Sequence, residues 1–475
     1  MKKHTAPKGS LRNFIIAGIF LASTLPANGY GADVSFVEAN ILSLKDAVRT
    51  AQRNDPWLVQ NRHSQDAVEA TSIAAATMPD PRMSVGLANF PTDTFDIKQD
   101  PMTQVKIGIT QILPRGDSLT IKQRQLQNLA RRFPFQRQDR RAKTVVTVGQ
   151  LWFDAYTAQQ SIALIQKDRP LFEQLADVAE ASYSSGIGRT RQQDIVRAQL
   201  ELTRLEDRLT MLKQQQETVQ EKLAGWLRGH FSEHYHTAST STASKLVQPY
   251  TLNKNQPRIA PLQQSLYRAS VKTEAAELHR YFIEHPAVQA IEKRIDASRL
   301  AVDLAREKYK PQFGLSAGYG YRDDGSTAGD RADFISFGLS FDLPVFTKNR
   351  QKKEVQAALS QAGAVKTGKW TMLRQMIAEF EKNRAQLNRL TQRQQLYQDR
   401  LLPQMHEQTE ASLTAYTNDD GDFAEVVRAR IAELNARIEL LNITVAKQKA
   451  IIRLNYYFMQ EANEIIARSY KKTPK

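Results

Sequence analysis

The sequence has no cysteine, only 8% aromatic residues and, after its N-terminal segment, no apolar run long enough for a transmembrane helix. The missing thiols exclude a cysteine-ligated zinc or iron–sulfur site, a thiol enzyme and a disulfide-stapled domain. Hydrophobic residues still make up 41% of the 475 positions, so a folded core is expected. If the chain spans a bilayer, it must do so with β-strands closed into a barrel.

The N-terminus has the order of a secretory signal: four cations, an apolar run over residues 14–25, and then small residues. We expect a signal peptide over residues 1–32, with an uncleaved membrane anchor as the alternative. Cleavage would lower the formal net charge from +16 to +12, because four cations leave and no acid leaves with them. An exported chain has little access to chromosomal DNA, so no nucleic-acid partner is expected and the charge is assigned to a periplasmic surface.

Short motifs recur in the same order about 230 residues apart, which predicts a tandem internal duplication. The predicted organisation is a first repeat over 33–228, an inter-repeat linker over 229–285 and a second repeat over 286–475. The matched pairs are Asn54-Asp55-Pro56 with Glu284-His285-Pro286, Pro79 with Pro311, Leu113-Pro114 with Leu343-Pro344, Pro170 with Pro403, Tyr183 with Tyr416, and Val196-Arg197-Ala198 with Val427-Arg428-Ala429.

Each repeat is predicted to contain a helix, two strands, a very long helix, a turn and another long helix. Apolar positions such as Leu44, Ala47, Val48 and Ala51 follow the spacing of an amphipathic helix. Helices of about 65 residues would reach ~100 Å at ~1.5 Å per residue, a length that suits a tube. The expected helices cover 44–78, 119–183, a segment ending at 227, 287–309, 352–416 and 423–470, and the expected strands cover 82–90, 103–113, 312–321 and 334–343.

All four strand-like runs alternate with period two. In residues 334–343, for example, Ile335, Phe337 and Leu339 alternate with serine and glycine. An apolar, aromatic-tipped face opposite a small polar face predicts a lipid-facing exterior around a watery lumen. A half-buried sheet on a soluble domain is the alternative. Four strands cannot close a barrel, so the chain must oligomerise, and three chains would give twelve strands.

Together, the repeat, the strand pairs, the Leu-Pro dipeptides and the tyrosine-led turns resemble the TolC-type outer membrane factor family over nearly all of the chain after residue 32. The segments 79–91, 101–103 and 111–114 are similar to its heavy-metal RND efflux branch. The resemblance implies a mixed α/β membrane protein. It would be a homotrimer with a 12-stranded outer membrane β-barrel, four strands per chain, continued by a long α-helical barrel. Many members of the metal branch carry a lipid on an N-terminal cysteine, so this cysteine-free chain would be anchored by its barrel alone.

The implied function is that of an outer membrane channel component of a tripartite efflux system, which passively conducts heavy-metal cations from the periplasm to the exterior. Its implied partners are a periplasmic adaptor (membrane fusion) protein, an inner-membrane RND-type pump and outer membrane lipid. A duct for drugs or for type I protein secretion is the alternative within the same fold. A periplasmic coiled-coil adaptor is an alternative of another class, although it does not explain the strands. No phosphate loop or catalytic triad is recognisable, so neither an enzyme nor a cofactor is expected.

The two turns between the long helices hold the candidate site residues. In the family, acids just after the second turn ring the periplasmic aperture; Glu425 matches the first of them, whereas Arg428 replaces the second. A Glu425–Arg428 or an Asp194–Arg428 pair could hold the gate closed, and three copies of an acid on the threefold axis would attract cations. The alternative is a solvated turn with helix caps. The candidate gate residues are Glu425, Arg428, Asp422, Asp194, Asp419 and Asp420, and the candidate adaptor contacts are Gly186, Gly188, Arg189, Arg191 and Gly421.

The linker holds three histidines, His230, His234 and His236, at a spacing that could bind a transition metal. A Ser/Thr-rich run over residues 237–244 follows them, and such a run is typical of a surface loop. These histidines are therefore weak candidates, and no metal site is assigned with conviction.

Overall fold

The computed structural model describes residues 40–185, 191–228, 250–267, 274–324, 330–418 and 421–458, all within one compact unit. The expected signal peptide over 1–32 lies outside the described residues.

In the first half, residues 40–228, helices and strands follow in the predicted order, after one short strand that was not predicted. After the short strand β1 (Asn40–Leu42), this half contains two helices, then two strands, then three further helices. They are α1 (Leu44–Asn54), α2 (Pro56–Ala74), β2 (Arg82–Ala88), β3 (Gln104–Ile112), α3 (Ser118–Ala130), α4 (Arg132–Ser185) and α5 (Gln192–Leu227).

The second half, residues 286–458, has the same order of element types. Between the halves, the described part of the linker holds β4 (Tyr250–Leu252), α7 (Gln264–Tyr267) and α8 (Ala275–Ile283). The elements of the second half are α9 (Pro286–Glu307), β5 (Phe313–Tyr321), β6 (Phe334–Phe341), α10 (Gln351–Leu396), the π-helical turn η3 (Tyr397–Leu401), α11 (Leu402–Thr417) and α12 (Phe423–Tyr456).

Two expected helices are each divided in the structure. The helix expected over 44–78 breaks at Asp55, whose carboxylate accepts a hydrogen bond from the Trp57 amide (3.1 Å) and so caps α2. The proline that follows Asp55 has no amide hydrogen and suits the first turn of a helix. The helix expected over 119–183 breaks at Arg131. By contrast, Pro170 lies inside α4 without ending it.

The helix expected over 352–416 is continuous but widens by one π-helical turn, η3, directly before Pro403. A proline inside a helix removes one backbone donor and crowds the preceding turn. A π-helical turn gives the extra room locally, so the helix continues into α11.

The four long strands form one antiparallel sheet in the order β2-β3-β5-β6. The register places apolar residues side by side across all four strands, as in the row Val85–Ile107–Tyr319–Ile335. This alternation was predicted from the sequence. Every residue of β6 is exposed, so none of the described segments covers this strand on either face.

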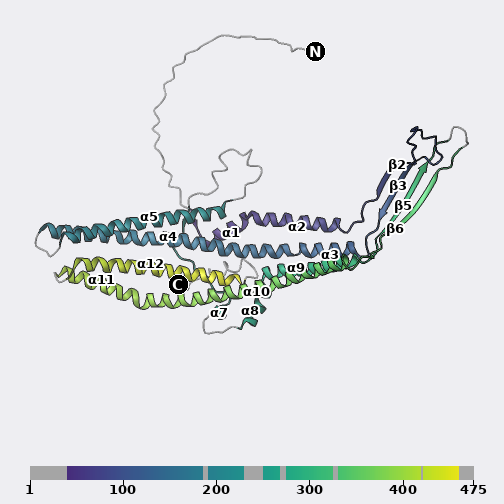
Figure 1. The fold of residues 1–475 in the computed structure, drawn as a ribbon. Helices are drawn as coiled ribbons and strands as arrows, with labels where there is room; N and C mark the ends of the chain where they lie inside the picture. Colours follow the sequence, from purple (N-terminus) through teal and green to yellow (C-terminus); the bar gives the residue numbers. More distant parts are fainter. Residues whose placement is uncertain are drawn as a thin grey trace, which may run out of the picture. The chain divides into compact units, whose positions relative to one another are not determined.

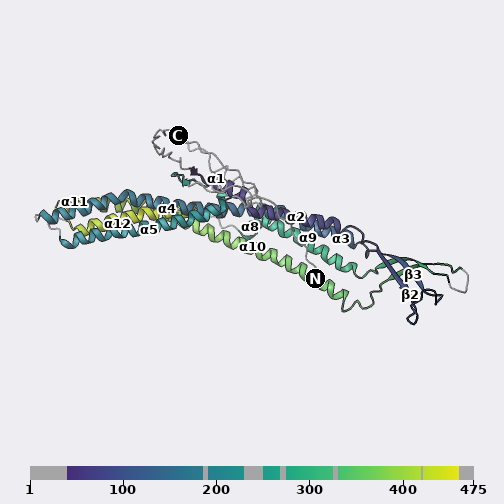
Figure 2. The ribbon, with the colours of Figure 1, turned by 90° about the horizontal axis from the view of Figure 1, so that it is seen from above.

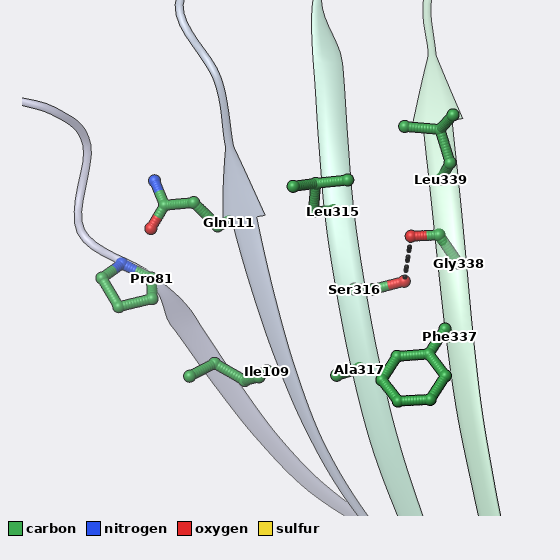
Figure 3. A pocket seen from close by; sticks show the side chains of 9 residues that line it. All are labelled: Pro81, Ile109, Gln111, Leu315, Ser316, Ala317, Phe337, Gly338 and Leu339. Atoms are coloured by element: carbon green, nitrogen blue, oxygen red, sulfur yellow. Dashed lines mark hydrogen bonds between the residues drawn. The ribbon is translucent and has the colours of Figure 1, made fainter.

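Small residues on the other face bring the strands close together. The Ser316 hydroxyl donates to the Gly338 carbonyl (3.3 Å), as Figure 3 shows. A methyl group on Gly338 would lie 2.6 Å from the Ser316 oxygen, and one on Gly318 would lie 2.9 Å from the Ser336 oxygen. Both contacts are too short, so a larger residue at either position would force the facing serine side chain to move.

The main hydrophobic core lies where α1, α4, α8, α10 and α12 meet. Trp152, Phe153, Phe282 and Phe380 are fully buried there, together with the predicted apolar face of α1. The Trp152 indole donates to the Leu42 carbonyl (3.1 Å) in β1, which pairs in parallel with β4. The linker is therefore tied to the long helices through this small sheet.

The long helices form two antiparallel hairpins, α4–α5 and α11–α12 (Figure 1). A second core cluster joins them, with Ile165 from α4, Leu209 from α5 and Leu434 from α12 in contact. Figures 1 and 2 both show the strands beyond α3 at one end of the helical region, with the end of α4, the start of α5, the end of α11 and the start of α12 at the other. None of the described helices is both long and apolar enough to cross a membrane.

Candidate functional site

At the second turn, between α11 and α12, the described residues Gly421 and Asp422 make a close backbone contact and a helix cap. The Asp422 carboxylate accepts a hydrogen bond from the Ala424 amide (3.1 Å) and caps α12. Gly421 lies against the end of α11, where a methyl group would come within 2.5 Å of the Tyr416 nitrogen. The Tyr416 ring meets the Phe423 ring edge-on at 5.6 Å. Asp422 therefore has the capping role that the sequence offered as the alternative to a gate role.

Glu425 and Arg428 form an ion pair of 2.9 Å on one face of α12. The Arg428 Nε also donates to the Ala424 carbonyl (3.2 Å). The two side chains are 45% and 67% exposed, so water screens their attraction. Within one chain, the arginine at the position of the second family acid thus neutralises the first acid.

Within one chain, Asp194 and Arg428 each have another partner, so the expected Asp194–Arg428 pairing stays a prediction. The buried carboxylate of Asp194 accepts a hydrogen bond from the Arg191 amide (2.9 Å), and its own amide donates to the Arg191 carbonyl (2.8 Å). Asp194 thus caps α5 from the third helical position. The local contact wins because it lies only three residues away along the chain.

An apolar layer joins the two hairpins close to their turns. Ala179 of α4, Ala198 of α5, and Phe423 and Val427 of α12 are buried together. This layer fixes the start of α12, and with it Glu425 and Arg428, against the first hairpin.

Several expected site residues lie outside the part of the chain that the structure describes. They are Gly186, Gly188, Arg189, Asp419, Asp420, His230, His234 and His236. Within the described ranges, no group of three or more histidines and acids is arranged to hold a metal ion.

The structure places a buried charge cluster further along α12 that the sequence reasoning missed. Glu433 is only 3% exposed, yet its carboxylate contacts the His406 Nδ1 (3.2 Å), Arg430 (3.5 Å) and Arg437. Arg437 also reaches the buried Asp168 of α4 (3.4 Å). We call these five residues the Glu433 cluster.

The Glu433 cluster links α4, α11 and α12 by charge. A buried carboxylate is costly unless it is paired and hydrogen-bonded, and the two arginines and the histidine supply those partners. The spacing of Arg430, Glu433 and Arg437 along α12 is that of helix neighbours, a signal visible in the sequence. The sequence did not show that this face of the helix turns inward.

His285 is a second buried titratable group, at the start of α9. Its Nδ1 accepts a hydrogen bond from the Ala287 amide (3.2 Å), and its Nε2 lies 3.2 Å from the Tyr456 carbonyl. An imidazole with one acceptor and one donor nitrogen is neutral. Burial lowers the pKa of His285 below its usual value of 6.5, although the nearby Asp139 partly opposes this.

The apolar face of the sheet carries an open groove of about 750 Å³. Its lining includes Ile109, Leu315, Phe337 and Leu339, and Figure 3 shows these apolar side chains along three neighbouring strands. Gln111 is the longest polar side chain in the lining. The groove therefore offers apolar contact and no converging charges for a ligand.

Residues 278–457 match the sequence model of the outer membrane efflux protein family. The match covers the second half of the chain from α8 to the end of the described residues, and this segment is similar to that family. Proteins of this family are outer membrane efflux channels and not enzymes. No curated protein matches the sequence. The matched region contains Glu425, Arg428 and the α11–α12 members of the Glu433 cluster, but it does not reach Asp194.

Solved structures share the fold at low sequence identity. CusC, described for conformational changes during folding and transmembrane channel formation, aligns with a TM-score of 0.68 at 14% identity, covering 87% of this chain and 91% of that one. VceC, an outer membrane protein of Vibrio cholerae, gives 0.66 at 12%, covering 87% and 95%. The CmeC outer membrane channel of Campylobacter jejuni gives 0.66 at 13%, covering 90% and 89%. The chain therefore shares the fold of these proteins along most of its length.

Proposed function

We propose that the chain is the outer membrane channel component of a tripartite efflux system, and that it acts as a homotrimer. The observation that carries this proposal is the bare four-stranded sheet, with one apolar face and an unpaired edge at β2 and at β6. Unpaired edges and an uncovered apolar face require a partner surface. Three copies supply twelve strands, which close into a barrel with the apolar rows toward lipid and the Ser–Gly rows toward the lumen.

The long hairpins continue the barrel into the periplasm under this proposal. At ~1.5 Å per residue, the 54 residues of α4 reach about 80 Å. The turns at the far end of the hairpins then meet a periplasmic adaptor protein, which connects the channel to an inner-membrane RND-type pump. The channel conducts passively, because the energy comes from the pump. The same element order in both halves fits a duplicated gene segment.

We propose heavy-metal cations as the substrate, with drugs and secreted proteins as the alternatives. Support comes from the segment over residues 79–91, which is similar to the metal branch, and from Glu425 at the start of α12. Three copies of Glu425 near a threefold axis would favour cations, while Arg428 reduces that preference.

A gene deletion tests both levels of the proposal. The deletion strain is exposed to a panel of metal salts and a panel of drugs, with the intact gene restored as the control. Greater sensitivity to metals alone supports a metal duct, whereas sensitivity to drugs alone overturns that assignment. Separately, the protein should fractionate with the outer membrane as a heat-resistant trimer. A monomer recovered without detergent would overturn the channel proposal itself.

A further inference from the structure

The chain leaves the sheet differently in its two halves. After β6, the segment Leu343-Pro344-Val345-Phe346 runs to α10 with three large apolar side chains in the open. Leu343 is 65% exposed, Val345 70% and Phe346 85%. A hydrogen bond from the Val345 amide to the Leu343 carbonyl (2.8 Å) folds this segment tightly. We call residues 343–346 the exit loop.

The matching segment after β3 is polar, and hydrogen bonds hold it against the rest of the chain. Arg115 pairs with Asp342 and donates to the Lys308 carbonyl (3.3 Å). The Asp117 amide donates to the Glu307 carboxylate (3.0 Å). Gly116, with φ of +46°, passes so close to this carboxylate that a methyl group would come within 2.2 Å of it. The first exit is thus satisfied by the chain itself, whereas the exit loop has its apolar side chains uncovered.

Four exposed cations follow the exit loop within ten residues: Lys348, Arg350, Lys352 and Lys353. None of the four forms an ion pair within the described ranges; Lys353 donates to the Gln356 side chain (3.1 Å). Exposed apolar side chains next to unpaired cations match a phospholipid surface, where acyl chains lie beside anionic headgroups.

The exit loop also makes up a shortfall in strand length. A membrane-spanning β-strand needs about 9–11 residues, whereas β6 has 8 and β2 has 7. The exposed apolar positions of β6 end at Phe341 and resume at Leu343, so the apolar band continues past the strand.

We propose that the exit loop inserts into the periplasmic leaflet of the outer membrane and that the four cations bind its anionic phospholipid headgroups. This inference rests on the proposed channel function. It assigns a lipid-binding role to a segment between strand and helix, and it distinguishes the two halves of the chain. A second copy of the chain is the other possible cover for the loop.

The test uses the natural absence of cysteine, because a single cysteine can then be labelled without further substitutions. Phe346→Cys carries an environment-sensitive fluorophore in trimers reconstituted into phosphatidylcholine vesicles with nitroxide-labelled lipid as the quencher. Phe337→Cys, on the apolar face of β6, reports whether the sheet meets lipid. Val178→Cys, an exposed position of α4, serves as the control away from lipid. Trimer assembly is checked on gels for each variant.

We expect lipid to quench the label at position 346 about twofold more than the label at position 178. Quenching at 337 but not at 346 overturns the inference and leaves the channel proposal standing. Protection of the 346 label from aqueous iodide without lipid quenching also overturns it, because a second copy then covers the loop. Absence of quenching at both 337 and 346 overturns the channel proposal as well.

The role of the cations is tested in the same vesicles. Adding phosphatidylglycerol should increase quenching at position 346, because anionic lipid draws the cations to the surface. The quadruple change K348Q/R350Q/K352Q/K353Q should remove this dependence, whereas K366Q/R389Q, two exposed cations further along α10, should leave it intact. An unchanged phosphatidylglycerol dependence in the quadruple variant would show that these cations do not bind the headgroups.

Discussion

Two charge pairs on α12 lie about 12 Å apart along the helix, at ~1.5 Å per residue, but in opposite surroundings. The Glu425–Arg428 pair, next to the turn, is open to water. In the Glu433–Arg437 pair the carboxylate is buried among α4, α11 and α12, Arg437 is partly exposed, and Arg430, His406 and Asp168 are further partners. Exposed pairs contribute about 0–1 kcal/mol to stability, whereas removing one partner from a buried pair costs several times more.

This difference separates two tasks that a gate at the second turn would need. The Glu433 cluster holds the hairpins together and has little freedom to change. The exposed pair contributes little to stability, so its charges are free to act on a passing ion or on a partner protein. Under the proposed gate role, different residues of one helix would therefore hold the hairpins together and act on the substrate.

The largest effect on stability is expected when the buried carboxylate of Glu433 is removed. Glu433→Ala removes the buried carboxylate but leaves Arg437 with Asp168 and Arg430 with Glu410, so the free energy of unfolding should fall by about 3 kcal/mol, the lower end of the cost of breaking a buried pair. Thermal unfolding of the detergent-solubilised protein, followed by circular dichroism, measures the change. The matched control is Glu439→Ala, which removes an exposed acid of the same helix that pairs with Arg393 (2.7 Å). Equal losses in the two variants would show that burial makes no difference here.

A smaller loss of stability is expected from crowding the turn that joins α11 to α12. Gly421→Ala puts a methyl group 2.5 Å from the Tyr416 nitrogen, so the turn must shift, at a cost of about 1–3 kcal/mol. Gly363→Ala in α10 is the control, because its methyl group meets open space and should stabilise the helix by about 0.5–1 kcal/mol. The same unfolding assay should therefore shift in opposite directions, and a shared direction would contradict the close contact at Gly421.

His285 extends the comparison to a buried group that avoids charge. Burial lowers its pKa, so above about pH 6.5 the imidazole is neutral in both the folded and the unfolded chain. Below that value the unfolded chain takes up a proton that the folded chain resists. The free energy of unfolding therefore decreases as the pH is lowered. His285→Asn keeps a side-chain acceptor for the Ala287 amide and removes the titration. The wild type should lose more stability than this variant between pH 7 and pH 5 in unfolding scans, and identical pH profiles would count against a neutral buried His285.

The smallest effect on stability is expected at the exposed pair. Glu425→Gln should change the free energy of unfolding by less than about 1 kcal/mol. If the proposed gate role holds, the same variant lowers the cation preference of the channel, and Arg428→Glu raises it by adding a second acid. Reversal potentials in planar bilayers under a salt gradient measure this preference. Identical reversal potentials in all three proteins would remove Glu425 and Arg428 from the gate.

The sequence predicted those parts of the fold that depend on local periodicity. Leu44, Ala47, Val48 and Ala51 are buried on one face of α1, as their spacing requires. Each of the four long strands lies within the range expected for it, because alternation identifies a strand whatever its neighbours are. The break at Arg131 was missed although Pro134 lies in the first turn of α4, where a proline is well tolerated.

The candidate site was predicted less completely, because burial and pairing depend on distant segments. Asp194 and Arg428 carry opposite charges near the two turns, yet Asp194 caps its own helix. The spacing of Glu433 and Arg437 is visible in the sequence, but α12 buries residues on several faces, so periodicity alone does not tell which charges turn inward. The expectations for Gly186, Gly188, Arg189, Asp419 and Asp420 stay predictions.

The Ser–Gly pairing on one face of the sheet has a consequence for the proposed pore. Where Gly318 and Gly338 face serines, hardly any side chain projects beyond the backbone, so the bore there is as wide as the strands allow. A wall of this kind offers few side-chain groups that could bind a solute or select between solutes. In the proposed channel, selection must then take place before the solute reaches the strands, and this stretch of the sheet conducts without selectivity.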